Sequence, residues 1–144
     1  MRAFWMIAAV LIGAGATDVH AQSLKDKQYF ADQEEALTKE ATFTNQKCES
    51  SITAKFDWSK PPKAEERSVY SANGYCAAAL EATRRVCETG KAGKDAVKEK
   101  IKTLVCSFGA ERTVALKDGT VNYNVKFDSS NDADYVFEYL QNNL

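Results

Sequence analysis

The chain has 144 residues, of which 44% are hydrophobic, and its formal net charge at pH 7 is −1. This length fits a single domain. The near balance of charge provides no general attraction to nucleic acid or to anionic membranes, so neither is predicted as a partner. The four cysteines and the single histidine narrow the remaining classes of protein further.

The first 21 residues are typical of a secretory signal peptide. Arg2 supplies the positive charge, Phe4–Ala16 is an uncharged and mostly apolar run, and Val19-His20-Ala21 offers the small residues that a signal peptidase reads. We expect cleavage after Ala21, with Ala14-Gly15-Ala16 as the alternative site. The apolar run is shorter than the roughly 20 residues that span a bilayer. The mature protein is therefore expected to be exported, to the periplasm or outside the cell, without a transmembrane segment or a lipid anchor.

Two segments precede the central part of the chain. Residues 22–47 are polar and favour helix, with a thin apolar stripe, so they are predicted to form an N-terminal helix or a partly ordered arm. Ile52–Trp58 alternates apolar and polar residues, as a half-buried strand requires. Pro61-Pro62 and the charged residues that follow end this strand in a loop, Ser59–Arg67.

The stretch Ser71–Phe108 organises the rest of the chain. An apolar face that includes Cys76 and Cys87 predicts a helix with Ser71 or Asn73 as its cap, and the turn Gly90–Gly93 leads into a second helix. Near Thr103 or Leu104 the spacing of the apolar residues changes from that of a helix to that of a strand. The apolar positions of this strand are Leu104, Cys106 and Phe108.

A hairpin and a last helix complete the predicted domain. After a turn at Gly109–Glu111, Asp118-Gly119 is a strong two-residue turn signal. Pairing outward from it gives one apolar and one polar face, which fixes the register. The apolar pairs are Leu116 with Val121 and Val114 with Tyr123, and the polar pairs are Ala115 with Asn122 and Thr113 with Asn124. Ser129–Asp132 can cap a helix whose core positions are Ala133, Val136, Phe137 and Leu140.

This order of elements predicts the α+β class. We expect residues 48–144 to form a small domain stapled by disulfides. Its sheet is predicted to be mainly antiparallel, with about four strands, and to be packed by helices.

The cysteines are predicted to form two disulfides, because small exported domains use such cross-links in place of a larger core. Cys76 and Cys87 lie on one helix, roughly 16 Å apart at 1.5 Å per residue, which is too far for a disulfide. Two pairings remain. Cys76 and Cys106 are expected at similar distances from the turn Gly90–Gly93, measured along the helices and the strand, so this pair is favoured. Cys48 is then left to pair with Cys87.

Histidine chemistry is excluded from the expected mature chain, because the only histidine is His20 in the signal peptide. Without it, Ser-His-Asp and Cys-His catalysis and histidine general bases are ruled out. Glycoside hydrolysis needs only two carboxylic acids at a suitable separation. The candidates in apolar surroundings are Asp57 and Glu81. Both lie on the polar side of their predicted elements, so the sequence favours a protein that is not an enzyme.

No metal or cofactor site is predicted. Asp128, Asp132 and Asp134 lack the glycine and the closing glutamate of a calcium loop, and capping of the following helix explains them better. The turn Gly90–Gly93 lacks the spacing of a phosphate-binding loop. The cysteine spacings do not resemble a zinc site.

Two groups of residues are candidates for a binding surface. Lys94, Lys98 and Lys102 line up on one helix face as a basic ridge, although a solvated face with Asp95–Lys98 and Glu99–Lys102 pairs is the favoured interpretation. The other group consists of tyrosines off the apolar faces, since tyrosine suits interfaces. These are Tyr70, Tyr135 and Tyr139, whereas Trp58, Tyr123 and Phe127 are expected in the core.

The leading hypothesis is an exported, non-catalytic binding or accessory protein. Its partner is expected to be another exported protein or a polymer of the cell envelope. A sharper version is an inhibitor of an exported hydrolase that uses the loop Ser59–Arg67. The alternatives are a carboxylate-dependent glycan hydrolase and a structural component of the envelope.

Overall fold

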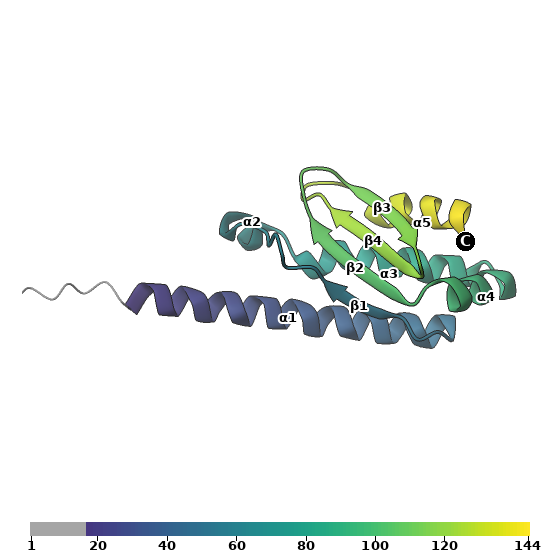
Figure 1. The fold of residues 1–144 in the computed structure, drawn as a ribbon, viewed down its shortest axis with the longest axis horizontal. Coiled ribbons are helices and arrows are strands. Elements are labelled where there is room, and N and C mark those ends of the chain that lie inside the picture. The colour runs from purple at the N-terminus through teal and green to yellow at the C-terminus, as the bar shows by residue number, and fades with distance from the viewer. Residues whose placement is uncertain (1–16) are drawn as a thin grey trace, which may run out of the picture.

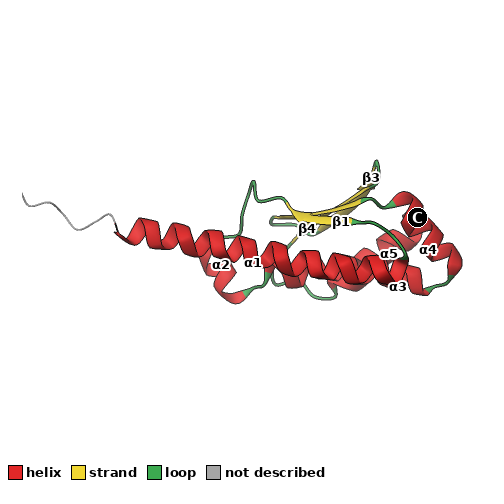
Figure 2. Ribbon diagram, turned by 90° about the horizontal axis from the view of Figure 1, so that it is seen from below, coloured by secondary structure: helices red, strands yellow, loops and turns green. Residues whose placement is uncertain are grey.

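The computed structural model describes residues 17–144, with side chains from Leu24 onward. Helices cover one face of a four-stranded sheet and leave the other face open (Figures 1 and 2). The α+β class is therefore confirmed. The predicted signal peptide lies outside the described residues, except for the helical backbone from Thr17 onward.

The elements follow the predicted order, with one additional short helix. They are α1 (Thr17–Cys48), β1 (Thr53–Phe56), α2 (Ala64–Val69), α3 (Ala72–Glu88), α4 (Lys91–Lys100), β2 (Thr103–Phe108), β3 (Thr113–Lys117), β4 (Thr120–Val125) and α5 (Asp132–Asn143). The segment 22–47 is helical throughout, and its buried residues Leu37 and Ala41 belong to the core. None of the helices in this part of the chain is both long and apolar enough to cross a membrane.

Local signals determine the junction between α3 and α4. The Ser71 hydroxyl caps α3 by accepting a hydrogen bond from the Gly74 amide at 3.1 Å. Gly90, between the helices, has a φ of 123°, a conformation that other residues rarely adopt. At Gly93 a Cβ atom would lie 2.1 Å from the carbonyl oxygen of Val86, so only glycine permits this close approach of α4 to α3.

The prediction of a mainly antiparallel sheet is wrong, because the sheet is mixed. Its strand order is β1-β2-β4-β3, and β1 with β2 and β2 with β4 are parallel pairs. The helices α2, α3 and α4 carry the chain back to its starting end between β1 and β2, which makes this pair parallel. β4 then inserts between β2 and β3, so that β2 does not pair with β3.

The β3–β4 hairpin has the predicted register. Leu116 lies opposite Val121 and Val114 lies opposite Tyr123. Asp118 and Gly119 have φ values of 49° and 76°, as a two-residue turn of type I′ requires.

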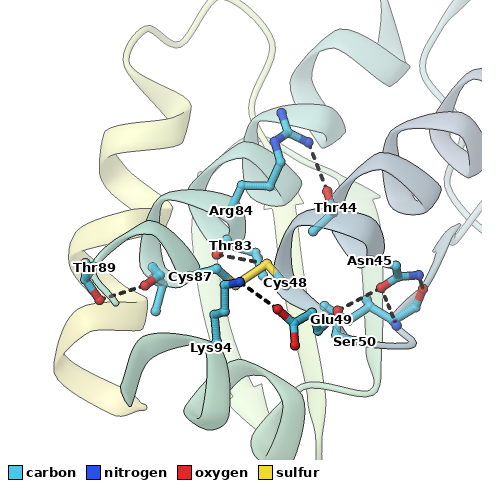
Figure 3. Close-up of a disulfide and its surroundings, with 12 residues drawn as sticks. Thr44, Asn45, Cys48, Glu49, Ser50, Thr83, Arg84, Cys87, Thr89 and Lys94 are labelled. Carbon is cyan, nitrogen blue, oxygen red and sulfur yellow. Dashed lines mark hydrogen bonds and ion pairs between the residues drawn. A yellow bond between two sulfur atoms is a disulfide. The ribbon is translucent and has the colours of Figure 1, made fainter. Parts of the chain in front are cut away.

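One face of the sheet and the helices enclose the core. Along β2 and β4, every second side chain is buried on this face, and Tyr123 is completely buried. The disulfide Cys76–Cys106 joins α3 to β2 inside this core, and Cys48–Cys87 joins the C-terminal ends of α1 and α3 (Figure 3). These are the two pairs that the sequence favours.

Candidate functional site

A pocket of about 340 Å³ lies where β1, β2 and β4 end. Three segments form it, each following one of these strands: 60–63 with Glu66, 108–110, and 126–127. Because the strands are parallel, their carboxyl ends lie at one edge of the sheet. In doubly wound α/β sheets, ligands bind outside the carboxyl ends of the parallel strands, and the pocket lies at the corresponding end of this sheet.

Stacked aromatic rings form one side of the pocket. Phe108 and Phe127 line it, with ring centroids 5.5 Å apart. Trp58 stacks on Phe108 at 5.4 Å, and Tyr70 stacks on Phe127 at 5.1 Å. These four residues, with Phe30 packed on Trp58 at 4.7 Å, form what we call the aromatic row. Phe108 and Phe127 form the apolar wall of the pocket, and the other members of the row pack behind or beside them.

The charged side chains that line the pocket are mostly basic. They are Lys60, Lys63, Lys126 and Glu66. The Glu66 carboxylate already accepts a hydrogen bond from the backbone amide of Lys63 at 2.8 Å. Lys126 has an exposed carboxylate nearby, that of Asp128, at 4.0 Å from its Nζ. The pocket therefore has an excess of positive charge, although the whole chain has a net charge of −1.

The Arg67 side chain connects the short helix α2 to α1. No residue of α2 is buried, yet the Arg67 side chain is only 13% exposed. Its guanidinium donates to the Asp26 carboxylate at 2.6 Å and to the carbonyl oxygen of Pro62 at 3.3 Å, and it lies over the rings of Tyr29 and Phe30. Arg67 therefore fixes the position of one wall of the pocket against α1.

A second polar cluster lies inside the molecule, around Asp132. This carboxylate is 8% exposed and accepts hydrogen bonds from the Tyr123 hydroxyl and from the Ser129 hydroxyl, the latter at 2.8 and 3.0 Å. Arg112 lies 3.5 Å from it. Burial raises the pKa of Tyr123 well above its usual range, and the neighbouring Asp132 adds to this effect. The cluster links β4 to α5, a structural role that exceeds the helix capping predicted for Asp132.

The two carboxylates that the sequence analysis considered for catalysis, and did not favour, are exposed to solvent. Asp57 and Glu81 are both exposed. The Ser59 backbone amide donates to Asp57 at 3.0 Å and lowers the pKa of that carboxyl, the reverse of what a general acid needs. In residues 24–144, no three His, Cys, Asp or Glu side chains lie close enough together to hold a metal ion.

The predicted basic ridge is partly neutralised by its neighbours. Lys94 forms an ion pair of 2.8 Å with Glu49 (Figure 3), and Lys102 donates to the carbonyl oxygen of Lys98. Asp95 pairs with Lys91 rather than with Lys98. Lys102 lies beyond α4, which ends at Lys100, so the helix carries only Lys94 and Lys98 of the predicted ridge. The contacts of these two lysines are typical of a solvated helix face.

Two of the three predicted surface tyrosines protect a strand edge. The Tyr139 hydroxyl accepts a hydrogen bond from the Leu116 amide of β3 at 2.8 Å, and the Tyr135 hydroxyl donates to the carbonyl oxygen of Arg112 at 3.2 Å. Covering an outer strand in this way limits unwanted strand pairing. Tyr70 is the predicted tyrosine that belongs to the aromatic row beside the pocket.

Sequence reasoning identified only one of the three segments that line the pocket. It singled out the loop Ser59–Arg67, but gave no role to Lys126 and placed Phe127 in the core. In an antiparallel sheet, successive strands end at opposite edges, so the predicted topology separated the segments that the structure brings together. A prediction of parallel pairing for β1, β2 and β4 would have placed the three segments together.

Comparisons of the chain with protein-family models, with curated proteins and with solved structures find no match. The pocket, the aromatic row and the exposed loops around them are the features of the molecule that indicate its function.

Proposed function

We propose that the mature protein is an exported, non-catalytic binding protein and that the pocket at the carboxyl ends of β1, β2 and β4 is its binding site. The observation that carries this proposal is the convergence of three distant segments on one concave site with aromatic walls and a basic rim. Ligand sites are usually concave and largely apolar, with a few polar groups that fix orientation. The partner is another exported protein, and the loop Ser59–Arg67 contacts it, as in an inhibitor or accessory protein.

Two further observations support this proposal. Disulfides such as Cys48–Cys87 and Cys76–Cys106 persist mainly in oxidising compartments outside the cytosol, which agrees with export. A glycan hydrolase would need one carboxyl with a raised pKa near a second one. The exposure of Asp57 and Glu81 gives neither residue that environment.

A quantitative pull-down from the organism's own exported fraction tests the proposal. The baits are the oxidised mature protein, the pocket variant K60A/K63A/K126A and the ridge variant K94A/K98A/K102A. Both variants lose three lysines, so a nonspecific effect of charge is the same for both. We expect one partner at near one-to-one stoichiometry with the wild type and the ridge variant, and its loss with the pocket variant.

The same experiment can contradict the proposal. Equal capture by the pocket variant would place the binding site elsewhere on the protein. If no partner is enriched with any bait, the protein-binding function is wrong. Assay of wild-type protein and of D57N/E81Q on envelope glycans would then test the hydrolase alternative.

A further inference from the structure

We infer that the pocket recognises a carboxylate joined to an apolar or aromatic group, as found at an acidic or C-terminal residue of a partner protein. This inference depends on the proposed function and adds the chemistry that the same site selects.

The charges around the pocket favour an anionic ligand. Lys60 and Lys63 form no ion pair within 4.0 Å among the described residues, and the partner of Lys126 is exposed and at the limit of that distance. The acid in the lining, Glu66, is already bonded to a backbone amide. A ligand carboxylate would therefore neutralise part of the positive charge of the three lysine ammonium groups. Hydrogen bonds between such charged groups are strong.

The rest of the lining favours an apolar body for this ligand. Apart from the lysines and Glu66, the pocket is lined by proline, phenylalanine, glycine and alanine, without any amide or hydroxyl side chain. The hydroxyl groups of a sugar would lose water there and find few partners, which costs binding free energy. A peptide group with an aromatic or aliphatic side chain would instead pack on Phe108 and Phe127. These considerations favour a peptide carboxylate over an acidic polysaccharide.

The size of the pocket agrees with one residue of a partner. Its volume of about 340 Å³ is at the lower end of the range for small-molecule sites, about 300–1,000 Å³. One side chain with its carboxylate fills such a space, and the exposed helix α2 beside it can contact the rest of the partner.

Trp58 provides the readout for a direct test. The other tryptophan, Trp5, belongs to the predicted signal peptide, so Trp58 is the single tryptophan of the expected mature protein. Its ring stacks on Phe108, which lines the pocket. Occupation of the pocket should therefore change its fluorescence.

The experiment titrates the oxidised mature protein with three probes. N-acetyl-L-phenylalanine carries the carboxylate and the ring, its amide has the same shape without the charge, and glucuronate carries a carboxylate on a sugar. We expect the acid to bind at least about tenfold tighter than the amide, the size of a charge-assisted hydrogen bond. Binding should weaken with salt.

The variants K60A/K63A/K126A and K94A/K98A/K102A identify where the acid binds. We expect the pocket variant to remove the preference for the acid over the amide, and the ridge variant to retain it. Thermal unfolding of each variant establishes that it is folded, and single substitutions of Lys60 or Lys126 replace the triple variant if it is not.

Two outcomes would overturn the inference without affecting the proposed function. Equal binding of acid and amide would make the pocket a purely apolar site, and tighter binding of glucuronate would assign it to an acidic polysaccharide. Failure of all three probes would also overturn it. In each case, pocket-dependent capture of a partner in the pull-down remains the separate test of the proposed function.

Discussion

The two ends of the parallel strands are built in different ways. Near the amino end of β1, the disulfide Cys48–Cys87 ties α1 to α3, and the Asn45 side chain bonds to both the amide and the carbonyl of Ile52 at 2.7 and 2.9 Å (Figure 3). At the carboxyl ends, the loops are held by stacked rings and by the ion pair of Arg67 with Asp26, without a covalent link in the loops themselves.

A small domain can combine stability with a binding site by placing them at opposite ends of its sheet. Binding residues commonly lie on loops that a rigid scaffold positions. Here one end of the sheet supplies the scaffold, and the opposite end presents side chains to a ligand. If the two ends are separate, a substitution at one end should leave the properties of the other end unchanged.

The largest expected effect is the loss of the disulfide at the scaffold end. The double variant C48A/C87A should lower the free energy of unfolding by about 2–5 kcal/mol, because the unfolded chain gains the freedom that the cross-link removed. Urea denaturation measures this change. In the variant that remains folded, the pocket should still bind N-acetyl-L-phenylalanine. A loss of binding together with a retained fold would show that the two ends are coupled.

The next largest expected effect on the free energy of unfolding comes from replacing Asp132. D132A should lower the free energy of unfolding by about 2–4 kcal/mol, because the buried Tyr123 hydroxyl and the partly buried Ser129 hydroxyl lose a charged acceptor. The matched control is D134A on the same helix, whose carboxylate is 58% exposed and pairs with Arg85. The control should change stability by less than about 1 kcal/mol. Equal effects of the two variants would contradict a special role for Asp132.

The dependence of stability on alkaline pH tests the burial of Tyr123. Its pKa is raised in the folded protein, and burial also raises that of Tyr29, so the unfolded chain loses these protons near pH 10 while the folded protein retains them. The free energy of unfolding should therefore be unaffected by these groups below about pH 10 and fall above it, with Tyr123 contributing a slope that approaches about 1.4 kcal/mol per pH unit. Urea denaturation between pH 8 and 11.5 measures the slope.

Comparison with Y123F isolates this tyrosine from the lysines, which also titrate in that range. The variant should show a shallower decline above pH 10. An unchanged slope would mean that Tyr123 ionises in the folded protein as it does in the unfolded chain.

The smallest expected change in stability is at the binding end. R67A should cost about 1 kcal/mol or less in unfolding free energy, because its ion-pair partner is partly exposed. Hydrogen exchange of the amides in residues 59–70 should nevertheless accelerate, and the probe should bind more weakly. R85A, which also removes an arginine that lies over an aromatic ring, should leave the exchange in this loop unchanged.

Local signals in the sequence were sufficient for much of this fold. The Asp118-Gly119 turn determines its hairpin, and the residues around Gly90 and Gly93 determine the junction of two helices. The cysteine pairs followed from helix and strand lengths. Each of these features depends on residues close in sequence or on simple distances along an element.

The arrangement of the strands could not be predicted in the same way. Parallel pairing of β1 with β2 depends on the path of three intervening helices, and the insertion of β4 between β2 and β3 depends on how the whole sheet covers α3 and α5. The pocket is a consequence of this arrangement. The sequence therefore did not indicate that Lys126 and Phe127 lie near Lys60. It also did not indicate that Asp132 is buried beside Tyr123.

The most direct test of the separate roles of the two ends is amide chemical-shift mapping by NMR. The oxidised mature protein is titrated with N-acetyl-L-phenylalanine, and the shifts are assigned along the chain. We expect the shifts to cluster in residues 57–70, 108–112 and 126–128, with little change around Cys48, Cys87 and Lys94. Shifts centred on the disulfide end or on the ridge of Lys94, Lys98 and Lys102 would contradict this expectation.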